Sequence, residues 1–201
     1  GVTGVQTCAL PIYRHDYGDR ITGTSTAQTS NSGVSTLFDA NFYVLTTARN
    51  VYKVLDNNGN AASTVEPTGT STSILTTGDG YKWKYMYSLP ASQQVNFLST
   101  DFMAVATDST VSSAAVDGAI NIVKIKTAGT GGTNGTYTNI PMRRDGSNGQ
   151  VSITIASGSV TAVSVTNAGT GYSYANIRVS DINVAGGGSL SGAELDCIIE
   201  P

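Results

Sequence analysis

The segment Tyr81–Leu89, YKWKYMYSL, alternates aromatic residues with other side chains, and this period of two constrains the fold more than any other feature of the chain. Successive side chains of a β-strand point to opposite faces, so the pattern predicts a strand with two different faces. One face carries four aromatic residues, which we call the aromatic ladder: Tyr81, Trp83, Tyr85 and Tyr87.

The aromatic ladder has two interpretations. Flat rings in a row bind bases or sugars by stacking when they are exposed, which would make the ladder a binding surface. Aromatic side chains also dominate core burial, and Tyr keeps a polar tip for the edge of a core. We expect the ladder to form the core of a sheet. The opposite face, which carries Lys82 and Lys84, is then expected to meet solvent or a partner.

Other segments on either side of the ladder also predict regular structure. Residues 42–47 and 51–55 are rich in β-branched and aromatic residues and predict a hairpin that is covered on both faces. Pro90 suits the first turn of a helix, and Val95 and Leu98 are spaced as an apolar pair on one helix face. We therefore expect one short α-helix at about 90–98, followed by extended chain.

The last third of the chain contains an internal repeat. The segment INIVKIKTAGTG at 120–131 aligns without gaps with VTAVSVTNAGTG at 160–171, and the AGTG tetrads coincide. Each copy predicts a β-strand that runs into a turn in which Gly tolerates positive φ. Residues 150–165 predict a hairpin that turns at Ser157-Gly158. Two related β-units with a hairpin between them suggest sheets packed on one another.

These patterns predict an all-β protein, a multilayer antiparallel β-sandwich with one short α-helix and long loops. Val2–Ile12, VTGVQTCALPI, is what a standard sequencing adapter encodes, so we expect 1–12 to be a non-native scar; the alternative is a genuine first strand. Residues 13–37 are expected to be an irregular polar loop region. Residues 38–201 are expected to be the β-sandwich structural domain, truncated at both ends, with a β-repeat region at 119–200.

Charge and cysteine content exclude several classes of protein. The formal net charge is −3 and the sequence pI is about 4.9, whereas nucleic-acid binders usually present a basic face. The longest basic cluster is Arg143-Arg144, which we expect to lie in a solvated turn. Without Cys8 in the suspected scar, Cys197 is the one remaining thiol, and we expect it to pack as a small hydrophobe. No apolar run is long enough for a transmembrane helix, and we expect neither nucleic acid nor membrane as a partner.

No catalytic, cofactor or metal site is predicted. The segment AGTGGTNG at 128–135 resembles a phosphate-binding loop, but a strand-forming stretch follows it where a helix would be needed. His15, the one histidine, is followed by Asp16 and Asp19, but no nucleophile motif accompanies them. The remaining carboxylates are scattered among turns. An enzyme would require two or more of them to converge with His15.

Residues 41–105 resemble a family of phage structural proteins. The match is carried mainly by the D-G-Y-x-W-x-Y-x-Y core at 79–87, by VEPTGT at 65–70 and by FLSTDF at 97–102. The chain resembles the baseplate wedge protein family of T-even-like myoviruses, the eighth gene product of that series, particularly its marine and cyanophage versions. The segment NAGTGYSYANIRV at 167–179 resembles repeats of phage tail proteins in general.

The resemblance implies a structural subunit of the virion rather than an enzyme. It implies a multilayer β-sandwich with short helices in its loops, assembly with other baseplate wedge proteins, and a homodimer in the intact protein. Location in the tail baseplate would follow, with synthesis in the host bacterial cytoplasm. The alternative, motivated by the aromatic ladder and the Gly- and Asn-rich loops, is a carbohydrate-binding or adhesin-like β-module of a phage tail.

Overall fold

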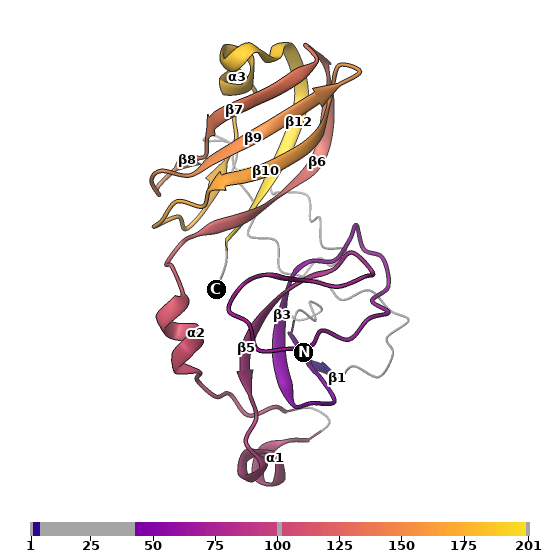
Figure 1. The fold of residues 1–201 in the computed structure, drawn as a ribbon, viewed down its shortest axis with the longest axis vertical. Helices are drawn as coiled ribbons and strands as arrows, with labels where there is room; N and C mark the ends of the chain where they lie inside the picture. The colour runs from indigo at the N-terminus through magenta and orange to yellow at the C-terminus, as the bar shows by residue number, and fades with distance from the viewer. Residues whose placement is uncertain (1, 5–42, 100–101, 200–201) are drawn as a thin grey trace. The chain divides into compact units, whose positions relative to one another are not determined.

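A computed structural model describes residues 2–4, 43–99 and 102–199 (Figure 1). β-Strands that form several mainly antiparallel sheets are the predominant regular structure among these residues, with only short helices, so the predicted all-β class is confirmed. The described residues belong to two compact units: the first ends at Ala115 and the second begins at Val116. The range 38–201, predicted as one domain, is therefore divided between two units. The polar region predicted at 13–37 lies outside the described residues.

The first unit contains a five-stranded sheet with the order β1-β2-β3-β5-β4. All neighbouring pairs are antiparallel except β1 and β2, which are parallel. Its strands are β1 (Val2–Gly4), β2 (Tyr43–Leu45), β3 (Asn50–Asp56), β4 (Leu75–Thr76) and β5 (Lys82–Ser88). The predicted hairpin is present as β2 and β3, with Phe42 outside the described residues. β1 lies within the segment 1–12 that we expected to be a scar, and it extends the sheet at its β2 edge.

Both faces of this sheet are covered, as predicted for the hairpin. Tyr81, Trp83 and Tyr85 pack on one face with Val44 and Tyr52. The prediction that Tyr87 shares this face is wrong, because Tyr87 packs in a different cluster with Leu45, Val51 and Leu89. The cause is a β-bulge: Val51 pairs with Tyr87 and Tyr52 with Tyr85, which leaves Met86 as an extra residue in β5.

Two helices follow β5 in the first unit. α1 (Ala91–Phe97) matches the predicted helix, and Pro90 occupies its N-cap position. α2 (Ser109–Ala114) was not predicted, because its Ser, Thr and Val residues are weak helix formers. Its N-cap compensates: the Asp108 side chain accepts hydrogen bonds from the backbone N–H groups of Thr110 and Val111.

The second unit contains two larger sheets and one two-stranded ladder. β6 (Ile120–Gly132) pairs with β12 (Gly188–Ile199), and a second sheet has the order β10-β9-β7. The remaining elements are β7 (Gly135–Pro141), β8 (Arg143–Arg144), β9 (Gln150–Ala156), β10 (Ser159–Asn167), β11 (Ala175–Asn176), α3 (Val179–Ile182) and the π-turn η1 (Asn183–Gly187). β9 and β10 form the predicted hairpin at 150–165, with positive φ at Ser157 and Gly158.

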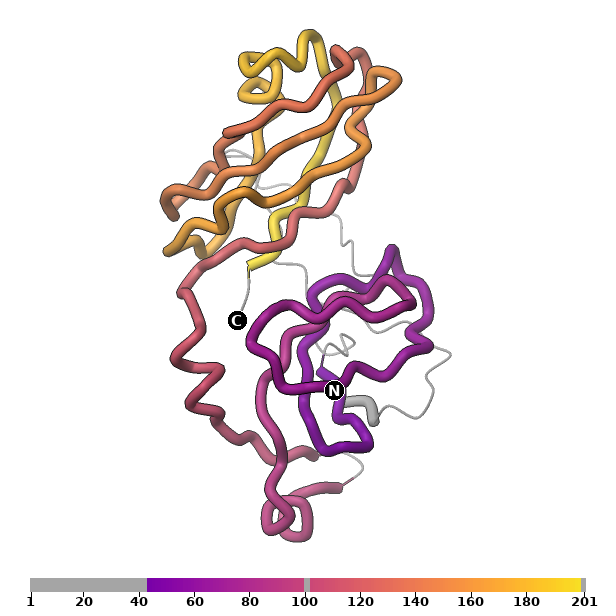
Figure 2. Tube along the Cα trace, viewed as in Figure 1, coloured from indigo at the N-terminus to yellow at the C-terminus, as the bar shows by residue number. Residues whose placement is uncertain are grey.

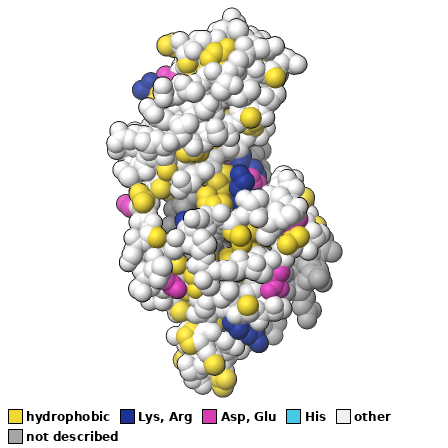
Figure 3. Space-filling view, viewed as in Figure 1, with side chains coloured by type: hydrophobic (Ala, Val, Ile, Leu, Met, Phe, Trp, Pro, Cys, Tyr) yellow, Lys and Arg dark blue, Asp and Glu magenta, His cyan; other side chains and the backbone are white. Residues whose placement is uncertain are grey.

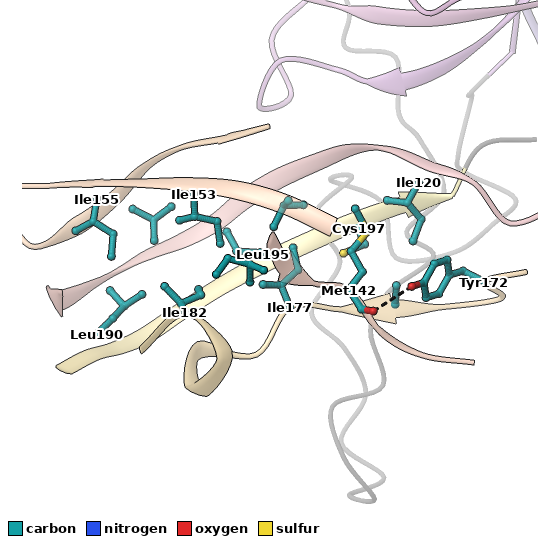
Figure 4. Packing of buried hydrophobic residues seen from close by; sticks show 14 residues of the cluster. Ile120, Met142, Ile153, Ile155, Tyr172, Ile177, Ile182, Leu190, Leu195 and Cys197 are labelled. Atoms are coloured by element: carbon teal, nitrogen blue, oxygen red, sulfur yellow. Dashed lines mark hydrogen bonds between the residues drawn. The ribbon is translucent and has the colours of Figure 1, made fainter. Parts of the chain in front are cut away.

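The core of the second unit lies between its sheets (Figure 4). β9 alternates buried and half-buried residues, so Val151, Ile153 and Ile155 point inward. Leu190 and Leu195 of β12 belong to the same cluster. Cys197 is also buried there, as predicted for a cysteine that packs as a small hydrophobe.

The internal repeat has a matching backbone conformation. Gly129 and Gly131 in the first copy have φ of 68° and 77°, and the equivalent Gly169 and Gly171 have φ of 65° and 72°. The settings differ: the first pair lies inside β6, whereas the second pair follows the end of β10. The prediction of a turn is therefore wrong for the first copy. Glycine is nevertheless required there, because φ is positive and the backbone of β12 passes too close to Gly129 for a Cβ atom.

Candidate protein interface

α1 begins at Ala91 and ends at Phe97, and none of its residues is buried. Its sequence, ASQQVNF, carries no charge. Leu98, which follows the helix, packs against the cluster around Tyr87, but the predicted partner Val95 points away from the core and is 85% exposed. A helix stabilised by its own packing would bury its apolar residues. α1 instead leaves its residues half-buried or exposed, and its backbone forms the coil at the bottom of the trace in Figure 2.

The chain downstream of α1 continues this exposed apolar surface. Phe97 is 63% exposed, Phe102 is 75% exposed and Val105 is 82% exposed. These three residues line the same hollow, and we call them the apolar patch. Hydrophobic side chains gather over this part of the first unit in the space-filling view (Figure 3). Single exposed hydrophobic residues are common on protein surfaces, but a group of them marks an interaction site.

The segment Phe102–Thr107 forms part of the lining of two hollows. One, of about 460 Å³, has a mostly apolar wall that includes Met86, Tyr87 and Val111. The other, of about 420 Å³, lies toward α1 and is lined in part by Gln93 and Phe97. Met103 and Val105 line both hollows. The segment therefore borders space that can admit side chains of a partner.

Two residues of the predicted aromatic ladder hold this segment in place. The Tyr87 hydroxyl donates a hydrogen bond of 3.1 Å to the carbonyl oxygen of Ala104, and burial raises the pKa of Tyr87. The Tyr85 hydroxyl donates to Oδ2 of Asp108 at 3.3 Å. Asp108 also caps α2, so the end of the segment is tied to both the sheet and a helix.

The other two ladder residues lie away from this site, in the core. Tyr81 and Trp83 are completely buried, and their rings stack with a centroid distance of 5.2 Å. The indole Nε1–H of Trp83 donates to Thr77 Oγ1 at 3.0 Å, which satisfies its one polar atom. Tyr85 and Tyr87 are buried as well. The ladder therefore forms core, and its rings present no open platform on which a sugar or base could stack.

The sequence-based reasoning missed the apolar patch. The one available signal was the stretch from Tyr85 to Val123, which contains hydrophobic residues at α1 and 102–106 but no Lys or Arg. Surface segments of soluble proteins usually carry both signs of charge. The predicted extended chain after the helix gave no reason to expect that Phe102 and Val105 would be exposed rather than buried.

The remaining predicted sites are not brought together. His15, Asp16 and Asp19 lie outside the described residues, and the structure groups no three potential metal ligands within the part it describes. Arg143 and Arg144 form the short strand β8 rather than a turn. Arg143 makes a two-pronged ion pair with Asp181, with Nη2 to Oδ1 at 2.8 Å and Nε to Oδ2 at 3.0 Å. The Arg144 guanidinium lies 5.8 Å from the ring centroid of Tyr174.

The fold and the patch define an all-β protein with an exposed, uncharged apolar surface on its first unit. No protein-family model, curated protein or solved structure matches the chain. Within the described residues, no helix has the length and apolar character needed to cross a membrane. The functional assignment therefore depends on the site itself and on the resemblance carried by residues 41–105.

Proposed function

We propose that this protein is a structural subunit of a contractile phage tail baseplate wedge, which acts through protein–protein assembly and not through catalysis. Its partners are other baseplate wedge proteins, its location is the virion, and the intact protein is a homodimer. The observation that carries the proposal is the apolar patch. Exposure of apolar side chains to water is unfavourable in free energy, and contact with a partner removes this unfavourable exposure.

The magnitude of that cost supports a role in assembly. Burial of a fully exposed Val or Phe side chain contributes about 1.5–3 kcal/mol. Three such side chains therefore offer several kcal/mol to a complex, before the cost of association is subtracted. Because α1 is uncharged, a partner can cover it without stripping water from a charged group.

The resemblance and the patch coincide in the chain. The segment FLSTDF at 97–102, which resembles the baseplate wedge family, contains two of the three patch residues, Phe97 and Phe102. The stretch at 79–87, which also resembles that family, contains Tyr85 and Tyr87. Their hydroxyls bind Asp108 and Ala104 and so hold the chain beside the patch. Both segments that resemble the family, 79–87 and 97–102, therefore contribute residues to the apolar patch or to its support.

The alternative function, a carbohydrate-binding or adhesin-like module, was motivated by the aromatic ladder as an open stacking surface. All four ladder side chains are buried, so that motivation is absent. No other observation within the described residues favours sugar binding over assembly.

The test begins with the genes that flank the coding locus, which should encode tail proteins. The full chain is then co-expressed with each flanking product and purified through a tag on the chain. We expect at least one product to co-purify, and we expect Val105→Asp to abolish its capture. Val184→Asp is the matched control, because Val184 is 90% exposed but lies on the second unit. Flanking genes unrelated to tails, or equal capture by both variants, would contradict the proposal.

A further inference from the structure

We propose that the segment Phe102–Thr107 is a strand-docking site for an extended segment of a different protein. The docked strand carries apolar residues at alternate positions and a Lys or Arg at the end that faces Asp108. This inference rests on the proposed function and specifies the chemistry of the partner. Three independent features of the segment lead to it: its backbone, the two hollows beside it, and the local charge.

The first feature is an unused row of backbone hydrogen-bonding groups. From Met103 to Thr107, no backbone N–H has an acceptor among the residues that the structure describes. The carbonyl of Ala104 is satisfied by Tyr87, and the N–H of Phe102 donates to Ser99 Oγ at 3.1 Å. The segment belongs to no strand or helix. A partner strand that runs alongside would supply acceptors and donors by main-chain pairing.

The second feature is the pair of hollows. Both are lined in part by this segment, and they share Met103 and Val105 as common lining. Side chains of a docked strand alternate in direction, so every second residue can enter a hollow while the main chain pairs with the segment. The mostly apolar wall of the larger hollow favours residues such as Val, Ile or Leu at those positions.

The third feature, charge, disfavours symmetric pairing with the same segment of a second copy and favours a partner that carries a basic residue. The chain from Tyr85 to Val123 contains three Asp and no Lys or Arg. A second copy of this region would bring carboxylates and no cation toward Asp108, which lines the larger hollow. Like charges placed opposite each other destabilise a strand pair, whereas an opposite charge stabilises it. A partner with a basic residue at the matching end complements the segment.

The segment is held ready for this pairing. Tyr87 fixes its middle through Ala104, and the Asp108 carboxylate is oriented by Thr110, Val111 and Tyr85. Little ordering is then required on binding, which favours affinity.

The test uses a labelled, end-blocked peptide, Lys-Val-Thr-Val-Thr-Val-Thr-Val, and the full chain, with binding followed by fluorescence anisotropy. In antiparallel pairing the amino-terminal Lys of the peptide lies opposite Asp108. A peptide with the same side chains but N-methyl groups on alternate residues lacks the N–H donors. We expect the N-methylated peptide to bind more weakly by a factor of about ten or more, because each lost hydrogen bond contributes about 1 kcal/mol. This comparison leaves the protein unchanged, so misfolding of a variant does not affect it.

Three protein variants complete the test. Val105→Pro removes one unused N–H and an exposed side chain, and we expect it to weaken peptide binding about tenfold. Val184→Ser, on the second unit, is the control and should bind as the unchanged chain does. Asp108→Asn keeps an N-cap residue of similar quality but removes the charge. We expect it to weaken the Lys peptide and to leave a peptide with Thr in place of Lys unaffected.

Several results would overturn the inference. One is the absence of binding by the peptide, and another is equal binding by the N-methylated peptide. A third is concentration-dependent self-association of the chain that Val105→Pro abolishes, which would make a second copy the occupant. Failure of the proposed function would look different: the peptide would bind as expected, but no tail protein would co-purify with the chain. Conversely, if Val105→Pro captured tail proteins as well as the unchanged chain does, the proposed function would stand but the strand-docking inference would be wrong.

Discussion

The ring of Tyr172 lies against Gly146 so closely that a Cβ atom at position 146 would stand 2.3 Å from Cγ of the tyrosine. Gly149 and Gly169 approach the same side chain, with Cβ positions at 2.8 Å and 2.6 Å from its atoms. Tyr172 is 3% exposed and follows the second AGTG tetrad of the repeat. Three glycines thus form a cradle for one buried tyrosine, which joins the end of the repeat to the β7–β9 connection.

We expect Gly146→Ala to destabilise the second unit by about 1–3 kcal/mol, because the added methyl overpacks the cradle. Urea unfolding followed by far-UV circular dichroism measures this loss. Gly78→Ala is the matched control, since no atom lies within 4 Å of its Cβ position and its φ is not positive. It should leave the unfolding midpoint nearly unchanged. Equal urea midpoints for Gly146→Ala and Gly78→Ala would contradict the claim that Tyr172 packs too closely against Gly146 for a methyl group.

Tyr172→Phe tests the hydroxyl at the far end of the same side chain. That hydroxyl donates to the carbonyl of Met142 at 3.0 Å, drawn as a dashed line in Figure 4, and accepts from the N–H of Gly149 at 3.1 Å. Removal leaves two buried backbone groups without this partner, which costs about 1–3 kcal/mol. Tyr137→Phe is the comparison, because its hydroxyl bond to Thr133 is exposed. Calorimetry should give a clearly lower melting temperature for Tyr172→Phe than for Tyr137→Phe.

The pH dependence of the first unit should reflect Asp79. Burial raises the pKa of Asp79, but hydrogen bonds from Thr77, Thr64, Val65 and Tyr81 outweigh it, so the folded pKa lies below the ordinary value. A depressed pKa stabilises the fold above the unfolded pKa of about 3.9, and this stability is lost as the pH falls through the folded value. We expect urea midpoints followed by Trp83 fluorescence to fall below about pH 4. Asp79→Asn should reduce that dependence. If the urea midpoint of the variant fell at low pH as steeply as that of the unchanged chain, Asp79 would not be its cause.

Trp83 is the one tryptophan in the chain, so its emission reports on the first unit alone. Because the indole is completely buried and bonded to Thr77, we expect blue-shifted emission that acrylamide quenches weakly. Addition of mono- and oligosaccharides should leave the spectrum unchanged. Quenching or a spectral shift by a sugar would restore the aromatic ladder as a binding surface and would count against core packing.

Several features of the fold could be predicted because they are local. The alternation in β5, the hairpin of β2 and β3 and the helix after Pro90 all follow from residue spacing within short windows. The bulge at Met86 could not be predicted, because it depends on how β5 pairs with β3 across the sheet. That single extra residue places Tyr87 on the face opposite Tyr85, where its hydroxyl reaches Ala104.

The amino-acid sequence by itself determined the hairpins of β2 with β3 and of β9 with β10, and the alternation of buried residues along β9, since side-chain direction along a regular strand depends only on backbone geometry. It also determined where glycine permits positive φ, as at Gly129 and Gly169. The tertiary structure alone decided which apolar residues are buried. Trp83 and Phe102 are both aromatic, but the first is completely buried in the sheet's core cluster, whereas the second is 75% exposed. Burial is a property of packing between distant segments, and no short stretch of sequence specifies it.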